Sequence, residues 1–129
     1  MWKLTEKQKK VIKAAEKTGK EFFYVGHYFD VFGHYILKIG TTDNLRRRRT
    51  EHNQNYRKSK TNPMKPGTEF EYDWFLPLSK YNTVRIEDRT RTALQNKYGE
   101  NFVRNDRFVF PVKPAEIRVT VRKTYTVAL

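Results

Sequence analysis

The sequence contains no cysteine. That absence excludes disulfide bonds, cysteine-ligated zinc and thiol catalysis together. No apolar run approaches the roughly 18 residues that a membrane-spanning helix needs, and the N-terminal residues 1–4 lack the hydrophobic region of a signal peptide. We therefore expect an intracellular protein that does not enter a membrane.

Acidic residues are scarce relative to basic ones. The 129 residues include 27 Lys and Arg but only 14 Asp and Glu, which gives a net charge of +13. A surface charged only for solubility needs a net charge of about 2–8, so this excess indicates a protein that binds a polyanion, above all a nucleic acid. Aromatic residues make up 15% of the chain, enough for the core of one folded domain.

Hydrophobic periodicity and turn residues predict an α+β domain with a small three-stranded antiparallel sheet flanked by helices. Residues 1–20 are expected to form an accessory basic helix, residues 21–110 the main domain, and residues 111–129 a C-terminal extension packed on it. The expected elements are a helix over 5–18, a β-hairpin over 21–40, a helix over 44–57, a strand over 68–76, a helix over 82–98 and a short hairpin over 102–110.

The third strand and the C-terminal tail allow more specific predictions. In the third strand, alternation places Phe70, Tyr72, Trp74 and Leu76 on one face and the acidic residues between them on the other. The tail stays open between two interpretations. The segment 114–116, Pro-Ala-Glu, is typical of a helix start, whereas the apolar residues over 117–121 alternate as in a strand.

The predicted hairpin brings polar groups onto one surface. Side chains alternate across a strand, so Tyr24 and Tyr28 share one face of the first strand, and Lys38 lies on the outward face of the second. If these faces coincide, two phenols and one amine lie together. Ordinary cross-strand aromatic packing is the alternative, since such pairs commonly stabilise sheets.

The helix over 44–57 has an unusual inner stripe. Leu45, Arg48, Arg49, His52 and Tyr56 share one side at helical spacing. Because a helix normally turns an apolar stripe inward, either this helix is barely packed or its guanidinium and imidazole groups line a cleft. The other cations around it are expected to contact phosphate. The predicted nucleic-acid contacts are Arg46, Arg47, Arg49, Lys58 and Lys60.

Glu87 is an acid among apolar helix positions. It is either paired with Arg91 at i+4 or a metal ligand. Taken with the other candidates, it suits phosphodiester hydrolysis, in which Tyr or Lys activates water, Arg neutralises the phosphate and Glu holds a metal ion. A lone carboxylate fits a site with one Mg²⁺ that keeps most of its waters.

The segment 38–52, KIGTTDNLRRRRTEH, resembles the second half of the GIY-YIG nuclease motif. In that motif a strand ends in Ile-Gly or Val-Gly, and a helix with an essential Arg follows. The resemblance covers about residues 21–110. Within the family, this segment is similar to a phage- and virus-associated branch that has Lys-Ile-Gly in place of Tyr-Ile-Gly. The family spacing falls on Arg48, and His52 stands where many members carry a His. Either residues 22–24 or residues 26–28 supply the first triplet.

The resemblance implies a DNA endonuclease that depends on Mg²⁺ or Mn²⁺ and acts on duplex or branched DNA. It implies Tyr24 or Tyr28 as water activator, Lys38 as second activator or phosphate ligand, Arg48 as phosphate clamp, His52 as acid or phosphate donor, and Glu87 as metal ligand. So small a domain would reach high specificity as a homodimer or by recognising DNA structure.

Two other functions fit part of the pattern. One is a non-cleaving DNA-binding module on the same fold. The other is a basic RNA-binding protein that uses Tyr24, Tyr28 and Tyr35 as stacking platforms. The RNA-binding interpretation leaves Glu87 unexplained.

Overall fold

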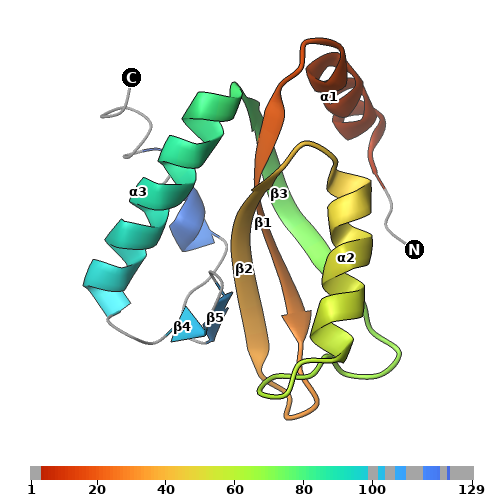
Figure 1. Ribbon diagram of the computed structural model, residues 1–129, viewed down its shortest axis with the longest axis vertical. Helices are drawn as coiled ribbons and strands as arrows, with labels where there is room; N and C mark the ends of the chain where they lie inside the picture. Colours follow the sequence, from red (N-terminus) through yellow and green to blue (C-terminus); the bar gives the residue numbers. More distant parts are fainter. Residues whose placement is uncertain (1–3, 99–101, 104–106, 110–114, 120–121, 123–129) are drawn as a thin grey trace.

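The computed structural model describes residues 4–98, 102–103, 107–109, 115–119 and 122 (Figure 1). It confirms the α+β class and every predicted element in the described part of the chain. In chain order the elements are α1 (Glu6–Lys17), β1 (Glu21–Phe29), β2 (Tyr35–Thr42), α2 (Leu45–Arg57), β3 (Glu71–Leu78), α3 (Lys80–Tyr98), β4 (Phe102–Val103) and β5 (Arg107–Val109).

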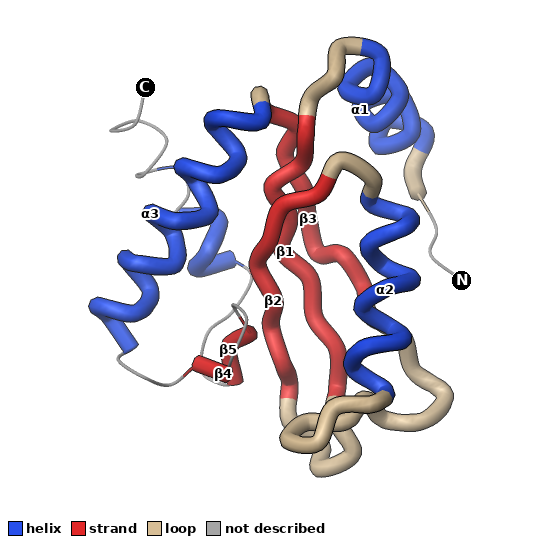
Figure 2. The backbone as a smooth tube through the Cα atoms, viewed as in Figure 1, coloured by secondary structure: helices blue, strands red, loops and turns tan. Residues whose placement is uncertain are grey.

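The sheet is antiparallel throughout and has the strand order β3-β1-β2-β5-β4 (Figure 2). Its three long strands, β3, β1 and β2, are the predicted sheet. The short β4–β5 hairpin extends it on the β2 side. Residues 115–119 are helical, so over these residues the helix interpretation is correct and the strand interpretation is wrong.

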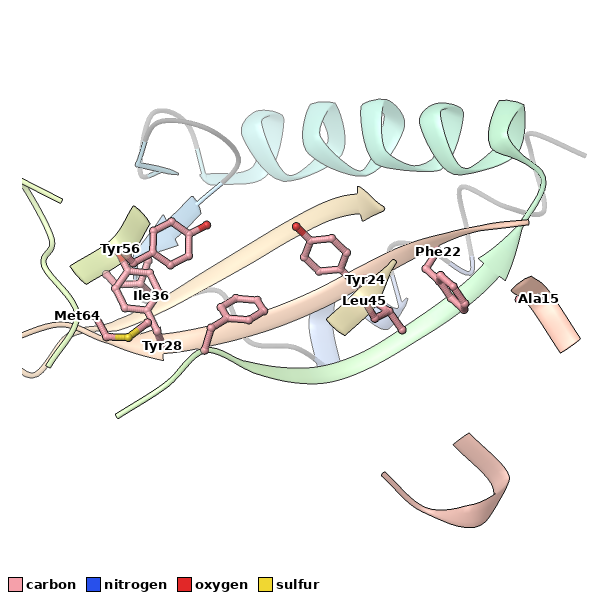
Figure 3. Close-up of a cluster of buried hydrophobic side chains, with 9 residues drawn as sticks. Ala15, Phe22, Tyr24, Tyr28, Ile36, Leu45, Tyr56 and Met64 are labelled. Atoms are coloured by element: carbon pink, nitrogen blue, oxygen red, sulfur yellow. The ribbon is translucent and has the colours of Figure 1, made fainter. Parts of the chain in front are cut away.

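Helices cover both faces of the sheet (Figure 1). On one face, α3 and Ile117 pack against Phe23, Val25, Leu37 and Ile39. On the other face, residues of α2 and one residue of α1 form a second hydrophobic cluster with the sheet. Its buried members are Ala15, Phe22, Tyr24, Tyr28, Ile36, Leu45, Tyr56, Met64 and Phe70 (Figure 3). The predicted alternation of the first two strands is thereby confirmed.

The third strand departs from its predicted alternation. Val25 pairs with Trp74, but the next residue of β1, Gly26, pairs with Tyr72. Asp73 is therefore an extra residue, a β-bulge, and the side chains before and after it change face. Phe70 and Tyr72 join the α2 cluster, whereas Trp74 and Leu76 pack on the α3 side. The prediction that these four aromatic and aliphatic residues share one face is wrong for this reason.

Polar contacts fasten α2 to the start of β3. The side-chain oxygen of Asn53 accepts a hydrogen bond from the backbone N–H of Phe70 at 2.7 Å. The hydroxyl of Tyr72 donates to the carbonyl of Leu45 at 2.7 Å, and burial raises the pKa of that phenol. These bonds satisfy polar groups in the core, and they fix the position of α2 on the sheet.

Gly26 is required by the bulge. A Cβ atom at this position would lie 2.2 Å from Cζ of Phe70 and 2.6 Å from the carbonyl oxygen of Glu71. Neither atom can withdraw easily, because Phe70 is fully buried and the carbonyl belongs to the backbone. The glycine therefore allows β3 to approach β1 closely.

We predict that Gly26→Ala lowers the free energy of unfolding by about 1–3 kcal/mol or more, the range for forcing extra volume into a packed core. The measurement is urea denaturation followed by circular dichroism. Gly19→Ala is the control, because Gly19 has φ +67° but no atom within 4 Å of the added Cβ, so its cost is left-handed strain of about 1–2 kcal/mol. A loss below about 1 kcal/mol for Gly26→Ala would contradict the packing argument.

Candidate active site

The start of α2 is fixed directly after β2. The side chain of Asn44 accepts the backbone N–H of Arg47 at 3.0 Å, as an N-cap. Thr42, at the end of β2, donates its hydroxyl to the carbonyl of Asn44 and accepts the Asn44 N–H, both at 3.1 Å. After this short connection, α2 runs back over the strands. Its inner stripe therefore faces the side chains of β1 and β2 that lie on the same side of the sheet as α2.

A cavity of about 560 Å³ opens between these elements. It has a buried floor and a more exposed rim: Tyr24, Lys38 and His52 are at most 6% exposed, whereas Asn55 is exposed. In Figure 3 the hydroxyl groups of Tyr24 and Tyr56 point into the same space. The lining residues are Tyr24, Lys38, Gly40, Thr41, Arg48, His52, Asn55, Tyr56, Ser59 and Glu87.

Tyr24 and His52 form the central pair of the floor. The phenol oxygen of Tyr24 lies 2.6 Å from Nε2 of His52. The Tyr24 ring lies over its cross-strand partner Gly40, where a Cβ would be 2.5 Å from the phenol oxygen. On its far side His52 stacks on Tyr56, with ring centroids 5.0 Å apart and planes 8° apart. The phenol and the imidazole are therefore held in fixed positions.

Two cations lie beside this pair. Partial burial by itself would lower the pKa of Arg48, but a hydrogen bond to Tyr24 and the nearby Glu51 carboxylate outweigh it, so the pKa is raised. The Arg48 side chain is 34% exposed, so its guanidinium is accessible from solvent while it touches the phenol. Lys38 brings an ammonium group to the floor of the same pocket.

Glu87 enters the pocket from α3, on the opposite face of the sheet. Among the described residues, β5 pairs with β2 from Ile36 to Lys38, and the pocket is lined by Gly40 and Thr41 farther along β2. The pocket therefore includes residues from both faces of the sheet. The carboxylate also forms an ion pair with Arg91 at 3.5 Å, so both sequence interpretations of Glu87 have a geometric basis.

Glu87 is the acid that lines this pocket among the described residues, and no cluster of three or more His, Cys, Asp or Glu side chains that could hold a metal ion occurs in that part of the chain. One carboxylate is compatible with Mg²⁺ or Mn²⁺ only as a largely hydrated ion, the state that Mg²⁺ favours because it dehydrates reluctantly.

The remaining predicted residues lie elsewhere. Tyr28 is buried outside the pocket lining, with its hydroxyl donating to the carbonyl of Asn62 at 2.9 Å. Arg49 is held by the protein itself, through Glu69 at 2.6 Å, Glu71 at 2.9 Å and the carbonyl of Phe70 at 2.8 Å. The other predicted nucleic-acid contacts are exposed, namely Arg46, Arg47, Lys58 and Lys60.

Residues 21–124 match the family described as the T5orf172 domain. The chain belongs to the T5orf172 domain family. This family is phage-associated and related to the nuclease-like fold of GIY-YIG proteins. No curated protein and no solved structure matches the chain. None of the described helices is long and apolar enough to cross a membrane.

The pocket of this T5orf172 domain includes residues that the sequence analysis did not select. Asn55 lies on α2 three residues beyond His52, so helical spacing alone could have identified it. Ser59 follows the end of the helix, where that spacing no longer applies. Thr41 had no such signal. It lies on β2 next to Gly40, and only the packing of the folded chain places it at the pocket.

The contact between Tyr24 and Gly40 provides a test of the floor geometry. In Gly40→Ala the new Cβ would meet the phenol oxygen at 2.5 Å, so Tyr24 must move away from His52. We predict a stability loss of about 1–3 kcal/mol together with the loss of any activity that depends on the pair. The measurements are the melting temperature and plasmid nicking. Wild-type nicking by Gly40→Ala would show that the position of the phenol does not matter.

Proposed function

We propose that this T5orf172 domain is a DNA endonuclease that hydrolyses phosphodiester bonds with the help of Mg²⁺ or Mn²⁺. The observation that supports it is the single pocket in which β1, β2, α2 and α3 bring together a phenol–imidazole pair, two cations and one carboxylate: Tyr24, His52, Lys38, Arg48 and Glu87. Family membership supports a nuclease or DNA-binding role, and the net charge of +13 suits a polyanionic substrate.

The pair at the floor is suited to proton removal. A phenol has a pKa near 10, so it is a weak base unless its own proton can leave. In the tautomer with its proton on Nδ1, His52 accepts the hydroxyl proton of Tyr24 over 2.6 Å. Tyr24 can then take a proton from the attacking water, whose oxygen bonds to phosphorus as the bond to the leaving oxygen breaks. The leaving oxygen takes a proton from solvent.

Arg48 has two functions in this proposal. In the free protein it donates a hydrogen bond to Tyr24, which is fully buried. A bound phosphate would draw the guanidinium toward its oxygens and leave the phenol open to water. Lys38, on the same floor, then shares the charge that develops on the phosphate, and such preorganised charge is a large contribution to catalysis.

Glu87 holds the divalent cation in this proposal. The bound cation would supply positive charge at the leaving oxygen. Without a cation, a carboxylate in a pocket that receives phosphate is repulsive. The position of Glu87 in the same pocket as Arg48 therefore favours an enzyme over a protein that only binds DNA.

A non-cleaving DNA-binding module is the second candidate, and the ion pair between Glu87 and Arg91 favours it, because that pair gives Glu87 a purely structural role. The RNA-binding interpretation has less support. Tyr24 and Tyr28 are fully buried, and Tyr35 is half-buried and stacks on His27 with centroids 4.8 Å apart. The three rings are thus not open platforms for bases.

Neighbouring arginines of α2 test the phosphate clamp. Arg48 and Arg47 both approach Glu51, at 3.8 Å and 3.6 Å, but only Arg48 lines the pocket. At saturating DNA, Arg48→Ala should slow plasmid nicking by about 10²-fold or more, whereas the matched control Arg47→Ala should keep most of the rate. Equal losses of rate at both positions would show that Arg48 is only a general DNA contact, like Arg47.

The acid of α3 distinguishes the enzyme from the binding module. Glu87→Gln should abolish nicking with Mg²⁺ or Mn²⁺ and leave DNA binding in chelator equal or tighter, since repulsion is relieved. Its melting temperature should change little, because a partly exposed ion pair contributes about 0–1 kcal/mol.

Asp88→Asn is the matched control for this experiment. Asp88 is the next residue, loses the same charge and also pairs with Arg91, at 3.1 Å, but it does not line the pocket. We expect it to retain nicking activity. Full activity in Glu87→Gln would remove this carboxylate from the reaction, and an inactive wild type with either cation would favour the non-cleaving module.

A further inference from the structure

The turn between β1 and β2 exposes apolar side chains where turns ordinarily carry polar ones. Phe32 is 67% exposed, Val31 47% and Phe29, at the end of β1, 43%. Isolated exposed apolar residues are ordinary. Three within four positions, on a chain with mean hydropathy −0.88, form a patch of the kind that marks an interaction site.

This turn is held rigidly by a buried carboxylate. Asp30 is fully buried and accepts the backbone N–H groups of Phe32 at 3.0 Å and His34 at 2.8 Å. Burial raises the pKa of Asp30, but the hydrogen bonds from Asn62 and His34 outweigh it, so the pKa is lowered and the group stays ionised. Phe32 is therefore presented on an ordered loop, which reduces the entropy lost when it binds a partner.

A basic loop lies against the same turn (Figures 1 and 2). Asn62 donates to Asp30 at 2.8 Å, the N–H of Val31 donates to the carbonyl of Pro63 at 2.9 Å, and the N–H of Lys65 donates to the carbonyl of Phe29 at 2.9 Å. The segment 57–67 contains no acidic residue. Its exposed cations are Arg57, Lys58, Lys60 and Lys65.

The basic loop also reaches the pocket. Ser59 lines the cavity, and its neighbours Lys58 and Lys60 are exposed. Positive charge thus continues from the rim of the pocket to the apolar turn. A polyanion that enters the pocket would follow this path, and a partner that presents phosphates with flat apolar faces between them would match both parts.

We propose that Val31 and Phe32, framed by Lys58, Lys60 and Lys65, form a second contact surface for duplex DNA, with Phe32 inserted against a base step. The proposal rests on the proposed function in taking DNA as the substrate. Tyr24 and Phe29 are five residues apart, and at about 3.3 Å per residue the turn lies about 17 Å from the floor of the pocket. At 3.4 Å per base pair that is about five base pairs from the bond to be cut.

The test uses the full chain in chelator, so that cleavage plays no part. Short duplexes with 2-aminopurine report unstacking by increased fluorescence, and anisotropy gives the dissociation constant. Phe32→Ala should lose the fluorescence increase and bind roughly tenfold more weakly, as expected for one lost stacking contact. Tyr81→Ala is the matched control, because Tyr81 is an aromatic residue of similar exposure, 68%, on α3, and should behave as wild type.

The cations of the loop give an independent readout. Lys60→Gln/Lys65→Gln should reduce the slope of log affinity against log salt by about 1.8, or 0.9 for each lost phosphate contact. Wild-type affinity and fluorescence in Phe32→Ala would overturn the proposal and would instead favour a protein as the partner of the turn. Plasmid nicking would still test the pocket separately. Phe32-dependent binding without any nicking would support this surface and refute the endonuclease. A wild type that binds no DNA would refute both.

Discussion

The arrangement of the pocket depends on one contact, the phenol of Tyr24 lying over Gly40 with its oxygen 2.6 Å from His52. It joins β1, β2 and α2 at a single point. A side chain at Gly40 would displace the ring, and a different register of α2 would remove the imidazole. Burial and stacking of His52 on Tyr56 make this polar contact rigid, which is the condition for preorganised chemistry.

The polar stripe on α2 has a structural cost that the fold compensates in two ways. A helix whose inner side carries Arg48, Arg49 and His52 gains little from apolar burial. Arg49 is instead fastened to two carboxylates and a carbonyl near the start of β3, and Asn53 accepts a backbone N–H there. These contacts secure the helix, so that Arg48 is left to face the pocket. Four consecutive arginines thereby have different roles because each points in a different direction.

Much of this was accessible from the sequence. The periodicities of the α2 stripe and of the β1–β2 hairpin correctly placed Tyr24, Lys38, Arg48 and His52 on facing surfaces, because helical and strand repeats determine which side chains share a side. The N-terminal helix was likewise predicted, and the structure closes its first turn with a capping box between Thr5 and Gln8, which is a local interaction. The same rules indicated an α+β domain.

Tertiary structure decided the rest. Alternation placed Tyr72 and Trp74 on one face, but the β-bulge at Asp73 separates them, and a bulge depends on the packing of Gly26 against Phe70, residues distant in sequence. Between Tyr24 and Tyr28 the motif left a choice, and only the direction of each hydroxyl shows that Tyr24 lines the pocket. Glu87 belongs to α3, on the opposite face of the sheet, and it lines the same pocket. The packing of the whole sheet decides which residues of the two faces meet, and no local pattern encodes it.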